Sequence, residues 1–399
     1  MASSAVSARQ RGVLVAALLL TGLSMRTAVT SVGAALEELQ HDLHASGTSA
    51  GVITTLPVIC FAGFGVLTPR LTHRFGAHRL LTVALIVTTI GLATRPLAGD
   101  AAVFALLSVV ALAGGAVSNV LMPSLVKLHF PDRIGTMTAV YTTALAVGAT
   151  AAACLTVPIG DVGGGWRTGL GTWAVLSGLA VLPWLPTVAR DRRDEARERG
   201  IPIGALVHSR TAWLLAIFFG TQSAQAYIAF GWFARFLTDH DISNGTAGLM
   251  LAVLSAIGIP VSIVAPRVPA RHHRLLVMVF VACYLVSYTL MAVAPRGTAW
   301  VWMVLAGVGA GTFPLVLTLL GLRARTPAMT ATLSAFVQVI GYVIAGIGPL
   351  LFGALFGATD SWTLPLVVLF VAVAVMTVVA VPSTAPRFVD DELAASRHE

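Results

Sequence analysis

The stretch Gly12 to Ala35, GVLVAALLLTGLSMRTAVTSVGAA, decides the fold, because it is apolar and longer than the roughly 20 residues that a membrane helix needs. Arg26 stands near its centre, where an arginine costs roughly +2.5 to +3.5 kcal/mol on insertion scales. At about 100° per residue, Arg26, Thr30 and Gly33 share one helical face with Gly22. Arg26 is therefore the leading candidate for substrate binding, and the alternative is an arginine that braces a neighbouring helix or snorkels.

The composition extends this membrane assignment to the whole chain. Of 399 residues, 57% are hydrophobic and 11% are charged, and the mean hydropathy is +0.87. That leaves too little polar surface for a soluble globule. Twelve apolar runs, the first at 12–35 and the last at 362–381, are too long for barrel strands. The sequence therefore predicts an all-α membrane protein with twelve transmembrane helices.

The net charge of +8 does not indicate nucleic-acid binding, because the basic residues form short clusters between spans. These clusters alternate with links that are poor in lysine and arginine, so the positive-inside rule places both termini in the cytoplasm. The three cysteines lie far apart inside apolar runs, which predicts neither a metal site nor a disulfide. We expect a multi-pass plasma-membrane protein, monomeric and without cofactor, whose partners are the bilayer and a small-molecule substrate.

Short strings in the first half recur in the second at a nearly constant offset. Met137-Thr138-Ala139 matches Met329-Thr330-Ala331, and Pro69-Arg70 matches Pro266-Arg267. Ordered matches of this kind indicate duplication. We therefore expect two pseudo-symmetric six-helix bundles, 1–189 and 212–399, joined by a charged cytoplasmic linker at 190–211.

Duplicated carriers hold their substrate near the bilayer midplane at the interface of the halves. The repeat offset pairs Arg26 with Ser223 in TQSAQAYIAFGW, so we expect one charged and one uncharged side to the site. The candidates on the uncharged side can donate and accept hydrogen bonds; they are Gln222, Ser223, Gln225 and Tyr227. The alternative for the Gln and Ser residues is adhesion between helices by interhelical hydrogen bonds.

Five strings resemble the major facilitator superfamily, and within it the cyanate permease and nitroimidazole transporter family. They are MRTAVTSVG (Met25 to Gly33), SNVLMPSLVK (Ser118 to Lys127), GTQSAQAYIAFGW (Gly220 to Trp232), GAGTFPLVLTLLGLRART (Gly309 to Thr326) and LSAFVQVIGYVIAGIGPLLFG (Leu333 to Gly353). The resemblance implies that the first, fourth, seventh and tenth helices line the cavity, with Asn119 as a cavity amide. Further candidates are Tyr141 on the fifth helix, Gln338 and Tyr342 on the eleventh, and Trp232 at the end of the seventh.

The loop PRLTHRFGAHR (Pro69 to Arg79) stands where this superfamily keeps a gating signature. The candidate gating residues are Arg70, His73, Arg74 and Gly76. His73 stands where the signature has its acid, so the usual salt-bridged gate is not expected here.

These features predict a secondary active or facilitative transporter that moves a small polar or anionic solute, cyanate-like or nitroimidazole-like, by alternating access. No P-loop occurs, and no histidine falls clearly within a span, so we do not expect an enzyme. One alternative is a broad-specificity drug efflux carrier that stacks its substrates on Trp213, Phe218, Phe219 and Trp232. A membrane sensor without transport is the other.

Overall fold

The computed structural model describes residues 8–44, 47–188 and 202–395, and every regular element in these ranges is a helix. Twelve helical stretches are long and apolar enough to cross a membrane, the first being Gln10–Ala34 and the last Thr363–Ser383. The predicted all-α, twelve-span architecture is confirmed. The chain divides into two compact units, Met1–Gly200 and Ile201–Glu399.

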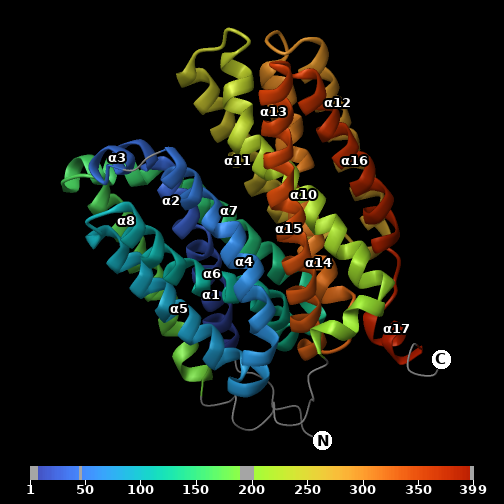
Figure 1. The fold of residues 1–399 in the computed structure, drawn as a ribbon. Coiled ribbons are helices and arrows are strands. Elements are labelled where there is room, and N and C mark those ends of the chain that lie inside the picture. The colour runs from blue at the N-terminus through green and yellow to red at the C-terminus, as the bar shows by residue number, and fades with distance from the viewer. Residues whose placement is uncertain (1–7, 45–46, 189–201, 396–399) are drawn as a thin grey trace, which may run out of the picture. The chain divides into compact units, whose positions relative to one another are not determined.

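In the first unit the helices follow one another with short connections (Figure 1). They are α1 (Ala8–Met25), α2 (Thr27–Ala34), α3 (Leu36–Asp42), α4 (Gly47–Phe75), α5 (Ala77–Thr94), α6 (Ala101–His129), α7 (Ile134–Gly163) and α8 (Trp166–Val181). Short 3-10 turns are η1 (Arg95–Leu97), η2 (Pro131–Arg133) and η3 (Leu182–Thr187).

The second unit repeats this plan. Its helices are α10 (Arg210–Thr238), α11 (Asn244–Val264), α12 (His273–Val293), α13 (Ala299–Gly309), α14 (Thr312–Leu322), α15 (Pro327–Thr359), α16 (Thr363–Ser383) and α17 (Val389–Ala395). The 3-10 turns are η5 (Ile203–His208), η6 (Ala265–Arg267) and η7 (Ala270–His272). Most of the expected linker lies outside the described residues, and η5 and the start of α10 occupy its end.

Corresponding helices pair in the same way inside each unit. In the first unit α1 and α2 pack on α7, α5 packs on α6 and α8, and α4 packs on α6. In the second unit α10 packs on α15, α12 packs on α13 and α16, and α11 packs on α13. When the twelve spans are numbered in chain order, the first unit pairs span 1 with 5, 3 with 4, 3 with 6 and 2 with 4. The second unit has the equivalent pairs, 7 with 11, 9 with 10, 9 with 12 and 8 with 10. The shared pairing accords with the duplication that the sequence strings indicate.

Small residues permit the close approach of α1 to α7. A Cβ on Gly22 would lie 2.5 Å from the carbonyl oxygen of Tyr141, and one on Gly148 would overlap the carbonyl of Leu23. Close backbone approach through small residues is the usual way in which membrane helices associate. The α1 segment is therefore held firmly against α7.

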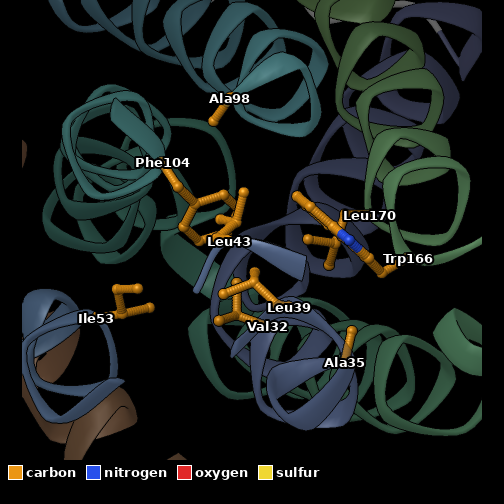
Figure 2. Close-up of a cluster of buried hydrophobic side chains, with 9 residues drawn as sticks. All are labelled: Val32, Ala35, Leu39, Leu43, Ile53, Ala98, Phe104, Trp166 and Leu170. Carbon is orange, nitrogen blue, oxygen red and sulfur yellow. The ribbon is translucent and has the colours of Figure 1, made fainter. Parts of the chain in front are cut away.

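At the end of the first span, a cluster of apolar side chains fixes α2 and α3 to the rest of the unit (Figure 2). Its buried members are Val32, Ala35, Leu39, Leu43, Ile53, Ala98, Phe104, Trp166 and Leu170. The rings of Phe104 and Trp166 meet edge to face with centroids 5.9 Å apart.

Candidate functional site

The first span is interrupted at Arg26. Helix α1 ends at Met25 and α2 begins at Thr27, while Arg26 has φ −105° and ψ −9°. Its carbonyl oxygen accepts hydrogen bonds from the amides of Val29 (3.1 Å) and Thr30 (3.0 Å) and from the Thr30 hydroxyl (3.0 Å). The carbonyl at the break is thereby satisfied within the span. The leading candidate residue thus lies at a local irregularity of its own helix.

The two faces of this span differ sharply. Arg26 and Thr30 are half-buried and Gly33 is exposed, so they form an open stripe. The opposite face carries small hydroxyl residues that are fully buried; they are Thr21, Ser24, Thr27 and Ser31. The open stripe is where a solute could reach the Arg26 guanidinium, a group suited to planar anions and electron-rich ends.

Gly22 does not belong to the open stripe. It is buried, and its role is the tight contact with Tyr141 on α7. Periodicity placed it beside Arg26, but periodicity alone does not say which neighbouring helix covers a position.

Asn119 and Tyr141 flank the first span from two neighbouring helices. A Cβ on Gly115 would lie 3.9 Å from the Met25 carbonyl oxygen, which brings α6 beside the break, and Asn119 follows one turn later. Asn119 is 8% exposed and Tyr141 is 1% exposed. The Tyr141 hydroxyl is buried and has no hydrogen-bond partner among the described residues.

In the second unit the polar candidates on α10 point in different directions. Gln222 and Ser223 are both buried, and the Gln222 amide donates to the Ser223 hydroxyl (2.6 Å). Gln225 binds neighbouring helices instead: Tyr288 of α12 donates its hydroxyl proton to the Gln225 carbonyl oxygen (3.0 Å). Gln225 therefore links α10 to α12. Tyr227 is half-buried, and its hydroxyl has no hydrogen-bond partner within the described part of the chain.

The candidates on α15 are also buried. The Gln338 amide donates to Ser334 one turn earlier (2.8 Å), and the Tyr342 ring meets Phe219 of α10 edge to face at 5.3 Å. Tyr342 therefore contributes to the packing of α15 on α10.

Trp232 lies within an aromatic cluster formed by α10, α15 and α16. Its ring centroid is 5.8 Å from Phe352, 6.0 Å from Phe356 and 6.5 Å from Trp362. A Cβ on Gly353 would lie 2.5 Å from the Trp232 ring, so the indole fills the space that this glycine leaves. Trp232 is half-buried, so part of its side chain packs within this cluster and part is accessible.

The gating candidates surround the turn between α4 and α5. Arg70, His73 and Arg74 are exposed, and among the described residues no carboxylate forms an ion pair with them. Gly76 has φ +86°, a backbone conformation that favours glycine, and it precedes the first residue of α5. The positive φ at this turn therefore explains why a glycine stands at position 76.

Two acidic residues of α3, Glu38 and Asp42, accept hydrogen bonds from the start of α8. The Glu38 carboxylate accepts from the Trp166 amide (3.2 Å) at the start of α8, and Asp42 accepts from the Trp166 indole (3.0 Å) and pairs with Arg167. Hydrogen bonds from Arg167 and Trp166 hold the pKa of Asp42 below its usual range. These contacts tie α3 to α8.

Two features were missed by sequence reasoning. Arg95, at the end of α5, is completely buried and reaches α2. Helix α17 binds the start of α10 through Glu392. A signal for Arg95 existed, since it is an arginine near the end of an apolar span, Ala77–Leu97, where a charge is costly.

The model of the Major Facilitator Superfamily matches residues 18–349. The chain belongs to the major facilitator superfamily. It is 34% identical to the uncharacterized transporter YycB of Bacillus subtilis over 371 residues, which cover 91% of each chain. It is 29% identical to the 2-nitroimidazole transporter of Escherichia coli (91% of this chain, 93% of that one) and 27% identical to the cyanate transport protein CynX of the same organism (85% and 88%).

Solved structures of the superfamily share the fold. The proton:xylose symporter XylE matches with a TM-score of 0.76 at 13% identity, covering 96% of this chain and 98% of that one. FucP in the outward conformation matches with a TM-score of 0.72 at 12% identity, covering 94% and 99%. This membership and the relatives identify a multi-pass membrane transporter of small solutes and not an enzyme.

Proposed function

We propose that the protein moves a small, polar or anionic solute, cyanate-like or nitroimidazole-like, by alternating access, and that Arg26 is its main anchor. The observation that carries the proposal is the half-buried Arg26 at a break in the first span, on the stripe that Thr30 and Gly33 leave open. A guanidinium presents a planar fork of donors that fits a planar anion or a nitro group. The relatives that transport cyanate and 2-nitroimidazole handle solutes of this kind.

In the same proposal, the substrate-binding residues beside Arg26 are Thr30, Asn119 and Tyr141 in the first unit. Those proposed in the second unit are Gln222, Ser223, Tyr227 and Trp232. The Tyr141 and Tyr227 hydroxyls support this assignment, because each is buried without a partner among the described residues. A buried polar group of that kind is stabilised when a ligand supplies the missing hydrogen bond. Gln338 and Tyr342 are proposed as supporting residues behind this set.

We further propose that the protein acts as a monomer in the plasma membrane, with both termini in the cytoplasm, and that Arg70, His73, Arg74 and Gly76 form part of an inner gate. The placement of basic clusters between spans supports this orientation. A cysteine probe at Ala196 tests it, since labelling only from the outside would refute it.

Two of the four aromatic residues named for the drug-carrier alternative are inaccessible, because Phe218 and Phe219 are buried. Trp213 is 38% exposed and its indole donates to the Val207 carbonyl (2.9 Å), and Trp232 is half-buried in its aromatic cluster. We therefore propose a small polar or anionic solute in preference to a drug.

The test is counterflow in proteoliposomes with cyanate and 2-nitroimidazole as probes. Replacing a bidentate, charge-assisted contact removes about 1.5–3 kcal/mol, so Arg26→Lys and Arg26→Ala should both lower uptake per folded protein about tenfold or more. Arg167→Lys, at an exposed site, is the matched control and should transport normally. Full transport by Arg26→Ala would refute the proposal, and loss of folded protein in both variants would support the bracing role.

A further inference from the structure

Arg95, at the end of α5 in the first unit, is completely buried. Its Nη1 donates to the carbonyl oxygen of Ala28 (2.8 Å) and its Nη2 donates to the hydroxyl of Ser31 (2.8 Å). The guanidinium carbon lies 6.0 Å from the centroid of the Phe104 ring. Within the described ranges no carboxylate pairs with Arg95. Burying a charge that only neutral groups stabilise costs free energy, so we expect Arg95 to have a specific structural or functional role.

Both acceptors lie on α2, immediately beyond the break at Arg26. The Ser31 hydroxyl, which accepts from Arg95, in turn donates to the carbonyl of Thr27 (2.6 Å), the first residue of α2. Phe104, which flanks the guanidinium, also belongs to the apolar cluster that packs on α2 and α3 (Figure 2). Arg95 and this cluster together fix the direction of α2.

A different set of contacts fixes α1 on the other side of the break. The Trp184 indole donates to the Thr21 hydroxyl (2.9 Å), and the Gly22 and Gly148 positions lie tightly between α1 and α7. Arg26 is thus located between two segments that both pack on α7, while each has side-chain hydrogen bonds of its own to a different part of the unit. The direction of its side chain depends on the angle between them.

We propose that Arg95 is a positioning residue for transport: it holds α2 at a fixed angle to α1 and so aims Arg26 at the solute. Arg95 does not itself touch the solute, because no part of its side chain is exposed. The fork of an arginine is required, since one lysine ammonium cannot reach the Ala28 carbonyl and the Ser31 hydroxyl with the same geometry. The link to transport rests on the role proposed for Arg26, whereas the effect on α2 does not.

The first experiment measures α2 directly. A cysteine at Gly33 has open space around its Cβ and an exposed position on α2, so its rate of reaction with a charged methanethiosulfonate reagent reports the direction of that helix. Cys60, Cys154 and Cys283 are first replaced by alanine. We expect Arg95→Lys to change the Gly33→Cys labelling rate by about fivefold or more, the size of a modest coupling between sites. An unchanged rate in folded protein would overturn the inference.

Two further variants separate positioning from general destabilisation. Ser31→Ala removes one of the two acceptors and should shift the labelling rate in the same direction by less; it keeps the test decisive if Arg95→Lys does not fold. Arg323→Lys is the matched control, because Arg323 is also buried and donates to backbone carbonyls, those of Ser383 and Thr384, in the other unit. Arg323→Lys should leave the Gly33→Cys rate unchanged, and an equal change there would refute a specific role for Arg95.

Counterflow with cyanate and 2-nitroimidazole then connects α2 to transport. We expect Arg95→Lys to raise KM for the transported probe while the maximal rate per folded protein stays near that of the wild type. Normal KM in Arg95→Lys together with impaired Arg26→Lys would refute the link while leaving the role of Arg26 intact. Normal transport by Arg26→Lys and Arg26→Ala would refute the proposed function and the link together, and the labelling rate would still decide whether Arg95 directs α2.

Discussion

Glu392 on α17 should stabilise the second unit more than its neighbour Asp391, although Asp391 is the residue that forms an ion pair. Glu392 accepts three hydrogen bonds at the start of α10, from the Ser209 hydroxyl (2.6 Å), the Thr211 hydroxyl (2.6 Å) and the Thr211 amide (3.0 Å). Asp391 pairs with Arg325 at 2.8 Å, but both side chains are more than half exposed. Exposed pairs contribute little, whereas a carboxylate at a helix N-terminus satisfies donors that otherwise lack partners.

The expected magnitude follows from these bonds. Hydrogen bonds to a charged group contribute about 1.5–3 kcal/mol when buried, and Glu392 is only half-buried, so we expect Glu392→Gln to cost about 1–2 kcal/mol. In a unit of about 200 residues this lowers the midpoint of thermal unfolding by roughly 2–8 °C. The assay is thermal unfolding of purified protein in detergent, with Asp391→Asn as the matched control. A larger loss in Asp391→Asn than in Glu392→Gln would refute the reasoning.

The pH dependence gives an independent check. Burial opposes ionisation of Glu392, but the hydrogen bonds from Ser209 and Thr211 outweigh it, so the pKa lies below its ordinary value of 4.5. A lowered pKa in the folded state means that the stabilisation is fully present above about pH 4.5 and is lost as the pH falls through the lowered value. The stability difference between wild type and Glu392→Gln should therefore be constant near neutral pH and shrink in acid. A difference that grew on acidification would contradict the assignment.

Two further predictions concern packing. Gly148→Ala should destabilise the first unit by about 1–3 kcal/mol in thermal unfolding, because the new Cβ would overlap the Leu23 carbonyl. Gly33→Ala is the control and should be tolerated, because its Cβ would meet no atom within 4 Å. Equal stability of the two variants would contradict the close contact of α1 with α7. Tyr288→Phe leaves the buried side-chain carbonyl of Gln225 without its hydrogen-bond donor, so it should lower the free energy of unfolding by about 1–3 kcal/mol. The KM for transport should not change. A raised KM at normal stability would instead indicate that Gln225 contributes to substrate binding.

The fold was predictable because hydropathy acts on whole spans. A membrane helix needs a long apolar run, and twelve such runs survive small errors at their ends. The charge of Arg26 inside such a run is similarly visible in sequence. Helical periodicity predicts that Arg26 and Thr30 share a face, and both are half-buried in the structure.

The rest depends on tertiary contacts that periodicity does not encode. Gly22 lies near Arg26 on a helical wheel, yet α7 covers it. The contacts of the Trp232 ring with Phe352 and Trp362 are likewise not visible in the sequence. Arg95 lies far from Ser31 in sequence, so its donation to that hydroxyl is not visible in the sequence.

The attachment of α17 has a consequence for how the protein is made. Glu392, which completes the hydrogen bonds at the start of α10, is translated 181 residues after Thr211. Chains fold from the N-terminus during synthesis, so the first unit can finish its packing while the second is still emerging. The second unit therefore reaches its final state only after Glu392 has been translated, and in a nascent chain that stalls before Val389 the start of α10 lacks the hydrogen bonds that Glu392 accepts.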